Sequence, residues 1–325
     1  MFSVKKQFTV PKKQLTEWYS KSISERNQLN NIAIDQKILG WDEMLENIPN
    51  RKIIPFHDKT HIVFFHVPKT AGTTLDFIIS KNLAIWGIFK QHGADFDKNV
   101  AAFYKSGQPP KTIMGHNELN DYFYQLLTRE RLVHITNIRE PISRVVSYYD
   151  FLKAQPSHPS HALAMKLSLK EFIQSPQSDE VHNAQAFRVL GLLKNSSFKS
   201  DNRSIEQLVD DAYNQLVNRF TLFGITEQFD AFLIMLLKAM KWHDVYYQRK
   251  NVTRKKLKTT IKDLDKETLD VIKENNQVDI ELYKKAKKCF EKRCQQLEIT
   301  ESVVEGFKQR NRAFQSLVQN NKELQ

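Results

Sequence analysis

The stretch FFHVPKTAGTTLDF, residues 64–77, decides the fold. It overlaps a short, continuous apolar run, HIVFFHV at 61–67, of the kind that forms a buried strand in a parallel sheet. A proline, a lysine and a group of small residues follow, and then apolar residues with helical spacing. The stretch therefore predicts a strand, a tight turn and a helix, with Lys69 and Gly72 in the turn.

The order of strand and helix recurs farther along the chain. Residues 111–116, 132–138 and 221–226 are short runs that predict further strands, and helical patterns follow the last two of them. Strands that alternate with helices are typical of a mainly parallel sheet covered on both faces. The chain is therefore predicted to form a P-loop-like, three-layer α/β/α domain. Ligands of such sheets bind beyond the carboxyl ends of the strands.

Composition divides the 325-residue chain into three parts. Residues 1–57 are polar, have partly helical spacing and predict a helical N-terminal extension of one or two helices that pack onto the main domain. The α/β domain is expected at 58–294, with a helical insertion at about 153–220. A helical tail rich in Gln, Asn and Glu is expected at 295–325.

The residue totals narrow the class of protein. Hydrophobic residues make up 41% of the chain and charged residues 26%, as in soluble globular proteins, and the net charge of +12 favours an anionic ligand. The two cysteines, Cys289 and Cys294, form no CxxC motif, so we expect neither a disulfide framework nor a zinc site, and we expect a reducing, cytoplasmic compartment. Neither a secretory signal nor a membrane span is expected, because long apolar runs are lacking.

The turn has the composition of an anion cradle. A turn from strand to helix directs several backbone N–H groups to one point, and the helix dipole adds partial positive charge there. Gly72 permits a close backbone approach, and Lys69 adds a full positive charge. Thr73 and Thr74 add hydroxyl donors. The pattern predicts a phosphate or sulfate site; a capped helix with a chance lysine is the alternative.

The position of the lysine separates this loop from the nucleoside triphosphate loop GxxxxGK[ST]. Here the lysine precedes the glycine, and no acidic residue at a strand end is placed to hold magnesium. A kinase or an ATPase requires that metal. We therefore expect a loop that holds a nucleotide phosphate without a metal.

A second polar pair follows the predicted strand at 132–138. Arg139 ends the strand, and Ser147 lies in the helix that Pro141 begins. An arginine at a strand end can donate two hydrogen bonds to a phosphate, and a serine in the next helix can reach the same group. Taken alone, this pair is better explained as a surface arginine and an ordinary helical serine.

Together, HVPKTAGTT and NIREPISRVVSYY resemble the sulfotransferase family that includes the heparan sulfate 2-O-sulfotransferases and many bacterial relatives. The resemblance covers roughly residues 60–290, in order. Its supporting parts are GH at 115–116, FGITEQFD at 223–230 and NQVDIELYKKAKKCF at 276–290.

The resemblance implies 3′-phosphoadenosine 5′-phosphosulfate (PAPS) as sulfuryl donor, adenosine 3′,5′-bisphosphate as product, and no metal. In the family, the loop holds the 5′-phosphosulfate, which implies contacts from Pro68, Lys69, Thr70, Ala71, Gly72, Thr73 and Thr74. Arg139 and Ser147 match the positions that bind the 3′-phosphate, and Thr226 is a candidate contact of adenine or of that phosphate. A basic segment, 248–262, matches the part that closes over the nucleotide, with candidates Arg249, Asn251 and Lys255. A solvated loop is the alternative there.

The resemblance also implies the catalytic groups. His116, in the Gly-His pair, matches the family's base, and an imidazole suits the removal of a hydroxyl proton near neutral pH. Lys69 is expected to stabilise the charge on the leaving phosphate oxygen during in-line transfer. His66 precedes the loop on a strand, and we interpret it as structural.

The acceptor is less defined. The 2-O-sulfotransferases carry a second histidine two residues before the base, where this chain has Met114, so their uronic-acid specificity is not carried over. A stretch NAQAFR implies an acceptor side at Asn183, Gln185 and Arg188, and helix packing explains these residues equally well. We expect the acceptor to be a hydroxyl-bearing glycan or another small molecule, with or without negative charge. We expect no nucleic-acid partner, and the sequence indicates no oligomeric state.

The sequence features leave three candidate functions. The first is a PAPS-dependent sulfotransferase of bacterial type that acts on a hydroxyl of a carbohydrate. The second is a nucleotide-dependent kinase on a related phosphate loop, against which the order of lysine and glycine argues. The third is a non-catalytic binder of anionic glycan or nucleic acid, which would show only salt-sensitive binding.

Overall fold

The computed structural model describes residues 12–50, 60–83, 88–91, 111–127, 129–193, 198–248 and 259–323. Its centre is a five-stranded sheet in the order β2-β3-β1-β4-β5. The strand pairs described in this sheet are all parallel. The strands are β1 Thr60–Phe65, β2 Ile88–Gln91, β3 Thr112–Gly115, β4 Arg131–Ile138 and β5 Leu222–Ile225. The predicted fold class, a mainly parallel sheet between helices, is confirmed.

The strand β2 was not among the four strands expected from the sequence. It is short and reads IFKQ, so half of it is polar. It lies at the edge of the sheet, where it pairs with β3 alone. An edge strand needs no continuous apolar run because one of its sides is not covered by a neighbouring strand, and the apolar-run criterion therefore misses it.

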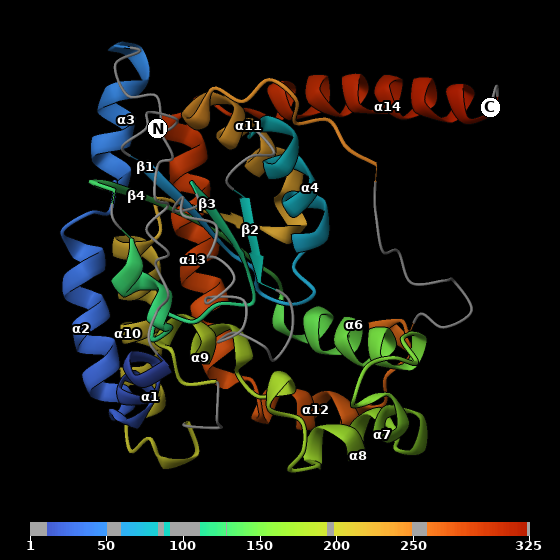
Figure 1. The fold of residues 1–325 in the computed structure, drawn as a ribbon. Helices are drawn as coiled ribbons and strands as arrows, with labels where there is room; N and C mark the ends of the chain where they lie inside the picture. The colour runs from blue at the N-terminus through green and yellow to red at the C-terminus, as the bar shows by residue number, and fades with distance from the viewer. Residues whose placement is uncertain are drawn as a thin grey trace, which may run out of the picture.

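Helices lie on both sides of the sheet (Figure 1). The α-helices with bounds described in full are α1 Lys12–Ser20, α2 Ile23–Asp35, α3 Trp41–Asn50, α4 Gly72–Asn82, α6 Pro141–Ala154, α7 His161–Lys166, α8 Leu169–Gln174, α9 Ala184–Leu190, α10 Ile205–Arg219, α11 Phe229–Met240, α12 Lys266–Glu274, α13 Gln277–Gln296 and α14 Glu301–Glu323. Short 3-10 turns include η1 Tyr122–Leu126, η2 Asp179–Val181, η4 Thr226–Gln228 and η6 Ile261–Asp263.

Two apolar clusters stabilise this arrangement. The larger one surrounds the sheet, whose strands β1, β3 and β5 are buried along their whole length. The smaller one joins α6, α7, α8 and α12 around Phe172, Ile173 and Ile272, which are fully buried. These four helices lie together beyond the carboxyl ends of the strands (Figure 1).

The N-terminal helices are part of the main core. Ile34, Leu39, Trp41 and Met44 belong to the large apolar cluster. The link between α2 and α3 pairs with β4, because Leu39 N donates to Leu132 O at 2.9 Å and Leu132 N donates to Lys37 O at 2.8 Å. The N-terminal extension predicted from the sequence therefore packs against the main sheet.

The C-terminal helix α14 is 23 residues long and runs out from the body (Figure 1). Two of its phenylalanines contact the domain. Phe307 is buried, and Phe314 stacks on Tyr246 with ring centroids 6.0 Å apart. Asn311 Oδ1 accepts a hydrogen bond from Tyr247 N at 2.9 Å, which attaches the first half of the helix to the domain.

The register aligns the ends of three neighbouring strands. Phe65 at the end of β1 pairs with Gly115 at the end of β3 and with Thr136 near the end of β4. The residues that follow each strand therefore meet at one edge of the sheet. They are the turn after Phe65, His116 after Gly115, and Arg139 after Ile138.

Candidate active site

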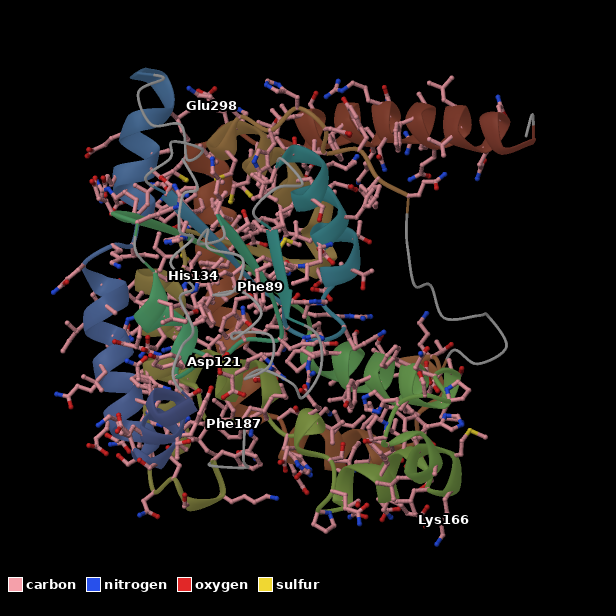
Figure 2. The ribbon with its side chains drawn as sticks, viewed as in Figure 1. Phe89, Asp121, His134, Lys166, Phe187 and Glu298 are labelled. Atoms are coloured by element: carbon pink, nitrogen blue, oxygen red, sulfur yellow. The ribbon has the colours of Figure 1, made fainter. Side chains whose placement is uncertain are left out.

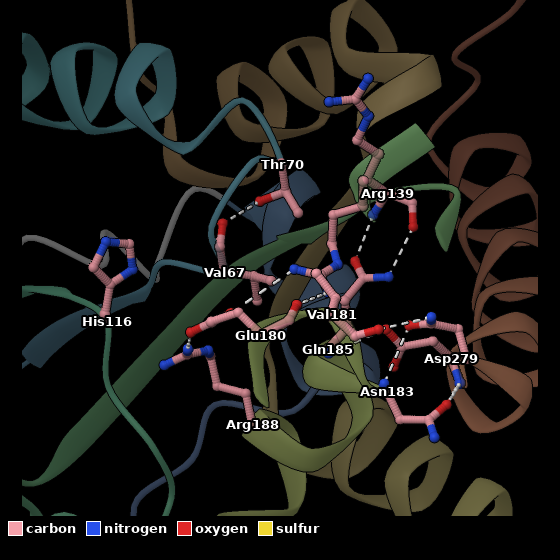
Figure 3. A network of polar contacts seen from close by, with 12 residues as sticks. Val67, Thr70, His116, Arg139, Glu180, Val181, Asn183, Gln185, Arg188 and Asp279 are labelled. Atoms are coloured by element: carbon pink, nitrogen blue, oxygen red, sulfur yellow. Dashed lines mark hydrogen bonds and ion pairs between the residues drawn. The ribbon is translucent and has the colours of Figure 1, made fainter. Parts of the chain in front are cut away.

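The turn between β1 and α4 has an unusual backbone. Lys69 and Ala71 both have positive φ angles, 67° and 63°. Left-handed conformations are unfavourable for residues with a side chain and persist where the surroundings enforce them, often at functional sites. Inside the turn, Thr70 is buried and its Oγ1 donates to Val67 O at 2.8 Å (Figure 3). The buried hydroxyl thus closes the loop on itself.

Ala71 stands at the N-cap position of α4. Alanine has no side-chain oxygen with which to accept from the first N–H groups of the helix, unlike the serines that cap α2, α8 and α10. Thr73, in the same first turn, is exposed. A helix start of this kind suits an anion, because backbone N–H groups and the helix dipole both point to it.

The side chain of His66 leaves no room for a Cβ atom at position 72. A Cβ added to Gly72 would lie 1.9 Å from Cδ2 and Nε2 of His66. The sequence interpretation was that this glycine lets the backbone approach a ligand; in the structure the space beside it is filled by the His66 ring. His66 also stacks on Phe64, with ring centroids 5.4 Å apart. The structural role expected for His66 therefore includes shaping the loop.

The neighbouring strand ends hold the loop in place. Asn137 Nδ2 donates to Thr70 O at 2.5 Å and to Thr226 Oγ1 at 3.1 Å, and Thr226 Oγ1 donates to Ile138 O at 2.9 Å. The side chain of Thr226, predicted to contact the nucleotide, thus joins β4 to the turn after β5. Asn137 is fully buried; it opens the motif NIREP, but the sequence analysis gave it no role because an asparagine in a strand does not reveal what it holds.

Lys69 lies over the face of α6. Its Nζ is 4.3 Å from the ring centroid of Phe151, an arrangement that favours a cation over an aromatic face. Ser147 lies one turn before Phe151 on the same helix and is partly buried. The pKa of Lys69 is lowered to about 8, chiefly by burial and also by the positive charge of Arg139, while the negative charge of Asp150 acts in the opposite direction. Because this ammonium is desolvated and repelled by Arg139, an anionic ligand would stabilise its charged form.

Arg139 connects the loop to the adjacent strand ends. Its Nη1 donates to Lys69 O at 3.1 Å, and its Nε is 4.0 Å from Glu227 Oε1. Its backbone is held on both sides by Gln185, whose Oε1 accepts from Arg139 N at 2.8 Å and whose Nε2 donates to Arg139 O at 2.9 Å (Figure 3). Burial lowers the pKa of Arg139. The guanidinium is thus placed beside Lys69 and keeps part of its surface exposed.

His116 occupies the other side of the loop from Arg139 (Figure 3). The ring centroids of His116 and His66 are 4.5 Å apart, and His116 Nδ1 lies 2.8 Å from His66 O. A carbonyl oxygen can only accept, so Nδ1 carries the hydrogen of the neutral imidazole. The lone pair is then on Nε2, which is the nitrogen able to take a proton.

Asn117, directly after His116, is a further residue that the sequence analysis missed. Its side chain is fully buried, and in the described part of the chain neither of its amide atoms has a hydrogen-bond partner. Buried amides are seldom left in this state, and such sites often bind water or a ligand. Its sequence context is an ordinary polar run, which carries no signal of burial.

The three residues predicted for the acceptor side have partners inside the protein. Gln185 holds Arg139 as described. Asn183 Oδ1 accepts from Asp279 N at 3.1 Å, and Arg188 forms an ion pair with Glu180 (Figure 3). Gln185 and Arg188 are buried. These contacts give the three side chains a role in packing α9, and their contact with an acceptor stays a prediction.

The predicted contacts Arg249, Asn251 and Lys255 lie outside the described residues. Thr259, which is the first described residue after the gap in the basic segment 248–262, is bound to α6, since its N and Oγ1 donate to the two carboxylate oxygens of Asp150 at 2.8 and 2.7 Å. Asp150 is buried, directly precedes Phe151, and its negative charge acts on Lys69. Thr259 is therefore attached to the helix whose Phe151 lies against Lys69.

The described residues fit an anionic ligand with two charged ends. Lys69 and Arg139 supply cations at adjacent strand ends, and the start of α4, which has no side-chain cap, supplies backbone donors. Within the described ranges, no group of three or more His, Cys, Asp or Glu side chains is arranged to hold a metal ion. The ligand class indicated by these donors is a phosphate or sulfate ester.

Comparison with known proteins identifies the class to which this fold and loop belong. The model of the sulfotransferase family matches residues 54–286, which is most of the chain. The chain belongs to the sulfotransferase family.

The curated proteins that match this chain do so at low sequence identity. Heparan sulfate 2-O-sulfotransferase 1 from Xenopus laevis is 26% identical over 199 residues, which are 55% of this chain and 54% of that protein. The proteins of the same name from Mus musculus and Homo sapiens are each 25% identical over 199 residues, with the same coverage. The chain spans about half the length of the curated relatives it matches. In the described part of the chain, no helix has the length and apolar composition needed to cross a membrane.

Proposed function

We propose that the protein transfers a sulfuryl group from PAPS to a hydroxyl of a carbohydrate. The observation that carries the proposal is the convergence of three groups at the ends of the neighbouring strands β3, β1 and β4: His116, the Lys69 loop and Arg139. Membership of the sulfotransferase family supports the donor class, and the curated relatives, named as heparan sulfate sulfotransferases, support a glycan acceptor.

The loop and Arg139 would bind the donor by its two charged ends. Lys69 and the first turn of α4 face the 5′-phosphosulfate in this proposal, and Arg139 with Ser147 faces the 3′-phosphate. Two charge-assisted contacts at opposite ends fix the orientation of a nucleotide as well as its affinity. They also select against ATP, which carries no phosphate on its 3′ oxygen.

His116 is proposed to take the proton of the acceptor hydroxyl at Nε2. The hydrogen bond from Nδ1 to His66 O fixes the tautomer and orients the ring, and it stabilises the imidazolium that forms. The bond between the acceptor oxygen and sulfur forms as the bond between sulfur and the phosphate oxygen breaks. The developing charge on that phosphate oxygen is stabilised by Lys69 Nζ.

The test uses PAPS labelled with radioactive sulfur and two acceptor sets. One holds polysaccharides, with desulfated heparan sulfate, chondroitin and neutral glucans. The other holds phenols and steroid alcohols of similar hydroxyl content. We expect label in the polysaccharide fraction together with stoichiometric adenosine 3′,5′-bisphosphate. Label in the phenols or steroids and in no polysaccharide would overturn the carbohydrate assignment.

A further inference from the structure

The segment that follows His116 is polar in sequence and buried in the structure. Residues 117–121 read NELND, yet Asn117, Glu118 and Asp121 are 0% exposed and Asn120 is 2% exposed. Figure 2 shows Asp121 within the body of the protein. Burial of polar side chains and carbonyls is unfavourable unless hydrogen bonds replace those to water. Holding such a segment away from solvent requires donors from elsewhere in the fold.

The main donor is Asn30 on α2. Its side chain is 0% exposed, and its Nδ2 donates to both Leu119 O and Asp121 O at 2.8 Å. Its Oδ1 accepts from Gln125 Nε2 at 2.6 Å. One amide thus makes three hydrogen bonds to the chain that immediately follows the proposed base, and α2 contacts the 3-10 helix η1 of that same chain.

A second donor comes from α1. Trp18 Nε1 donates to Asn120 O at 3.2 Å, and the Trp18 ring packs against Tyr122 with centroids 5.5 Å apart. Trp18 is buried, whereas the other side chains of α1 whose burial is described are exposed. Consecutive carbonyls of the segment, those of Leu119, Asn120 and Asp121, therefore all accept from N-terminal side chains.

We propose that Trp18 and Asn30 are positioning residues for His116. The ring of His116 is held from one side by the carbonyl of His66, and the backbone that carries it is held from the other side by α1 and α2. Both helices lie before residue 54, where the family match begins. The inference rests on the proposed function, because it takes His116 as the base.

The experiment compares variants of the full chain. Asn30→Asp keeps the size of the side chain and sets an oxygen against the carbonyls of Leu119 and Asp121. Asn27→Ala is the matched control, because Asn27 lies on the same helix and its Nδ2 donates to a different target, Leu190 O, at 3.1 Å. Trp18→Phe removes one hydrogen bond and keeps an aromatic ring, so it carries the same test if Asn30→Asp does not fold.

The first readout needs no acceptor. The tautomer and the titration of His116 are followed by nitrogen NMR of the imidazole, assigned among the ten histidines with His116→Gln. We expect a single Nδ1–H tautomer in the unmodified chain and in Asn27→Ala. In Asn30→Asp, and more weakly in Trp18→Phe, we expect a mixed tautomer or a displaced titration. A purely structural role would lower the melting temperature and leave these signals of the folded protein unchanged, which would overturn the proposal.

The second readout is turnover. We expect Asn30→Asp to lower kcat by roughly 10- to 100-fold, the loss typical of a misplaced catalytic group, with the affinity for adenosine 3′,5′-bisphosphate unchanged. Asn27→Ala should retain kcat. The two proposals fail separately: full activity in His116→Ala would remove the base assignment, whereas normal His116 signals and normal kcat in folded Asn30→Asp would remove the positioning role.

Discussion

The two sides of the site are held by different parts of the chain. The donor loop, residues 67–72, is fixed by strand ends of the α/β core, through Asn137 and Arg139. The chain that carries His116 is fixed by α1 and α2, which lie outside the family match. The difference teaches that the proposed nucleotide loop is held by residues inside the family match, whereas the placement of the proposed base can depend on segments that no motif marks.

His66 joins the two sides. Its ring occupies the space beside Gly72 in the donor loop, and its carbonyl accepts from His116 Nδ1. A change at either side can therefore reach the other through one residue. Substitutions on the base side, on the donor side and at the junction of His66 with Gly72 separate these contributions, and their expected effects fall in that order.

The largest effect is expected on the base side. His116→Ala should lower turnover by roughly 10²–10⁴-fold, the usual contribution of a general base, and should leave the affinity for adenosine 3′,5′-bisphosphate unchanged. Single-turnover transfer and equilibrium binding measure the two quantities. A loss of nucleotide affinity in parallel with turnover would mean that His116 belongs to the donor side.

On the donor side, Arg139→Ala should weaken binding of adenosine 3′,5′-bisphosphate by ~1.5–3 kcal/mol, as expected for a lost charge-assisted hydrogen bond. Arg131→Ala is the control, because Arg131 is an exposed arginine at the opposite end of the same strand. Calorimetric titration gives both values. Equal affinity in Arg139→Ala and the unmodified chain would remove the 3′-phosphate assignment.

The junction can be tested with Gly72→Ala. The added Cβ would lie 1.9 Å from the His66 ring, so we expect a loss of ~1–3 kcal/mol in the free energy of unfolding, as for other overpacked sites. Adding His66→Ala should restore part of that loss, because the two side chains compete for one space. Denaturant unfolding of the single and double variants measures the coupling, and strictly additive losses would show that the contact is not the cause.

The smallest effect is a dependence on pH. Because the pKa of Lys69 is lowered to about 8, chiefly by burial, its ammonium should contribute a constant amount to nucleotide affinity below pH 8. Above it, affinity should fall by at most about 1.4 kcal/mol per pH unit as the ammonium deprotonates. Without ligand, the unfolded chain binds more protons than the folded chain between pH 8 and the ordinary lysine pKa, so stability should rise with pH in that window. Lys69→Arg should abolish both slopes, and calorimetry at several pH values tests this.

The alternation of apolar runs and helical patterns was enough to predict the fold class and four of the strands, because buried parallel strands are continuous in sequence. The strand β2 escaped because its IFKQ sequence is half polar. The packing of α2 and α3 onto the main domain was expected from the helical spacing of residues such as Ile34 and Trp41, but the strand that they meet was not, since periodicity does not say what a helix packs against.

The site residues also divide into those that a sequence pattern marks and those that it does not. The sequence pointed to Lys69, Arg139 and His116 because each stands in a motif at a strand end, and their roles stay predictions. It gave no role to Asn137, Asn117 or Asn30, because the role of a single asparagine depends on contacts distant in sequence. The motif also suggested acceptor contacts for Gln185 and Arg188, whose observed partners lie within the protein.

The central claim is that the loop at Lys69 and the guanidinium of Arg139 hold the two phosphates of one nucleotide. Thermal unfolding with adenosine 3′,5′-bisphosphate, compared with ATP and magnesium, tests it most directly. A ligand present at ~100 times its dissociation constant adds ~2.7 kcal/mol to the free energy of unfolding. Stabilisation of that size by the bisphosphate, and little by ATP with magnesium, is the predicted result. Stabilisation by ATP with magnesium alone, or by neither ligand, would contradict the account.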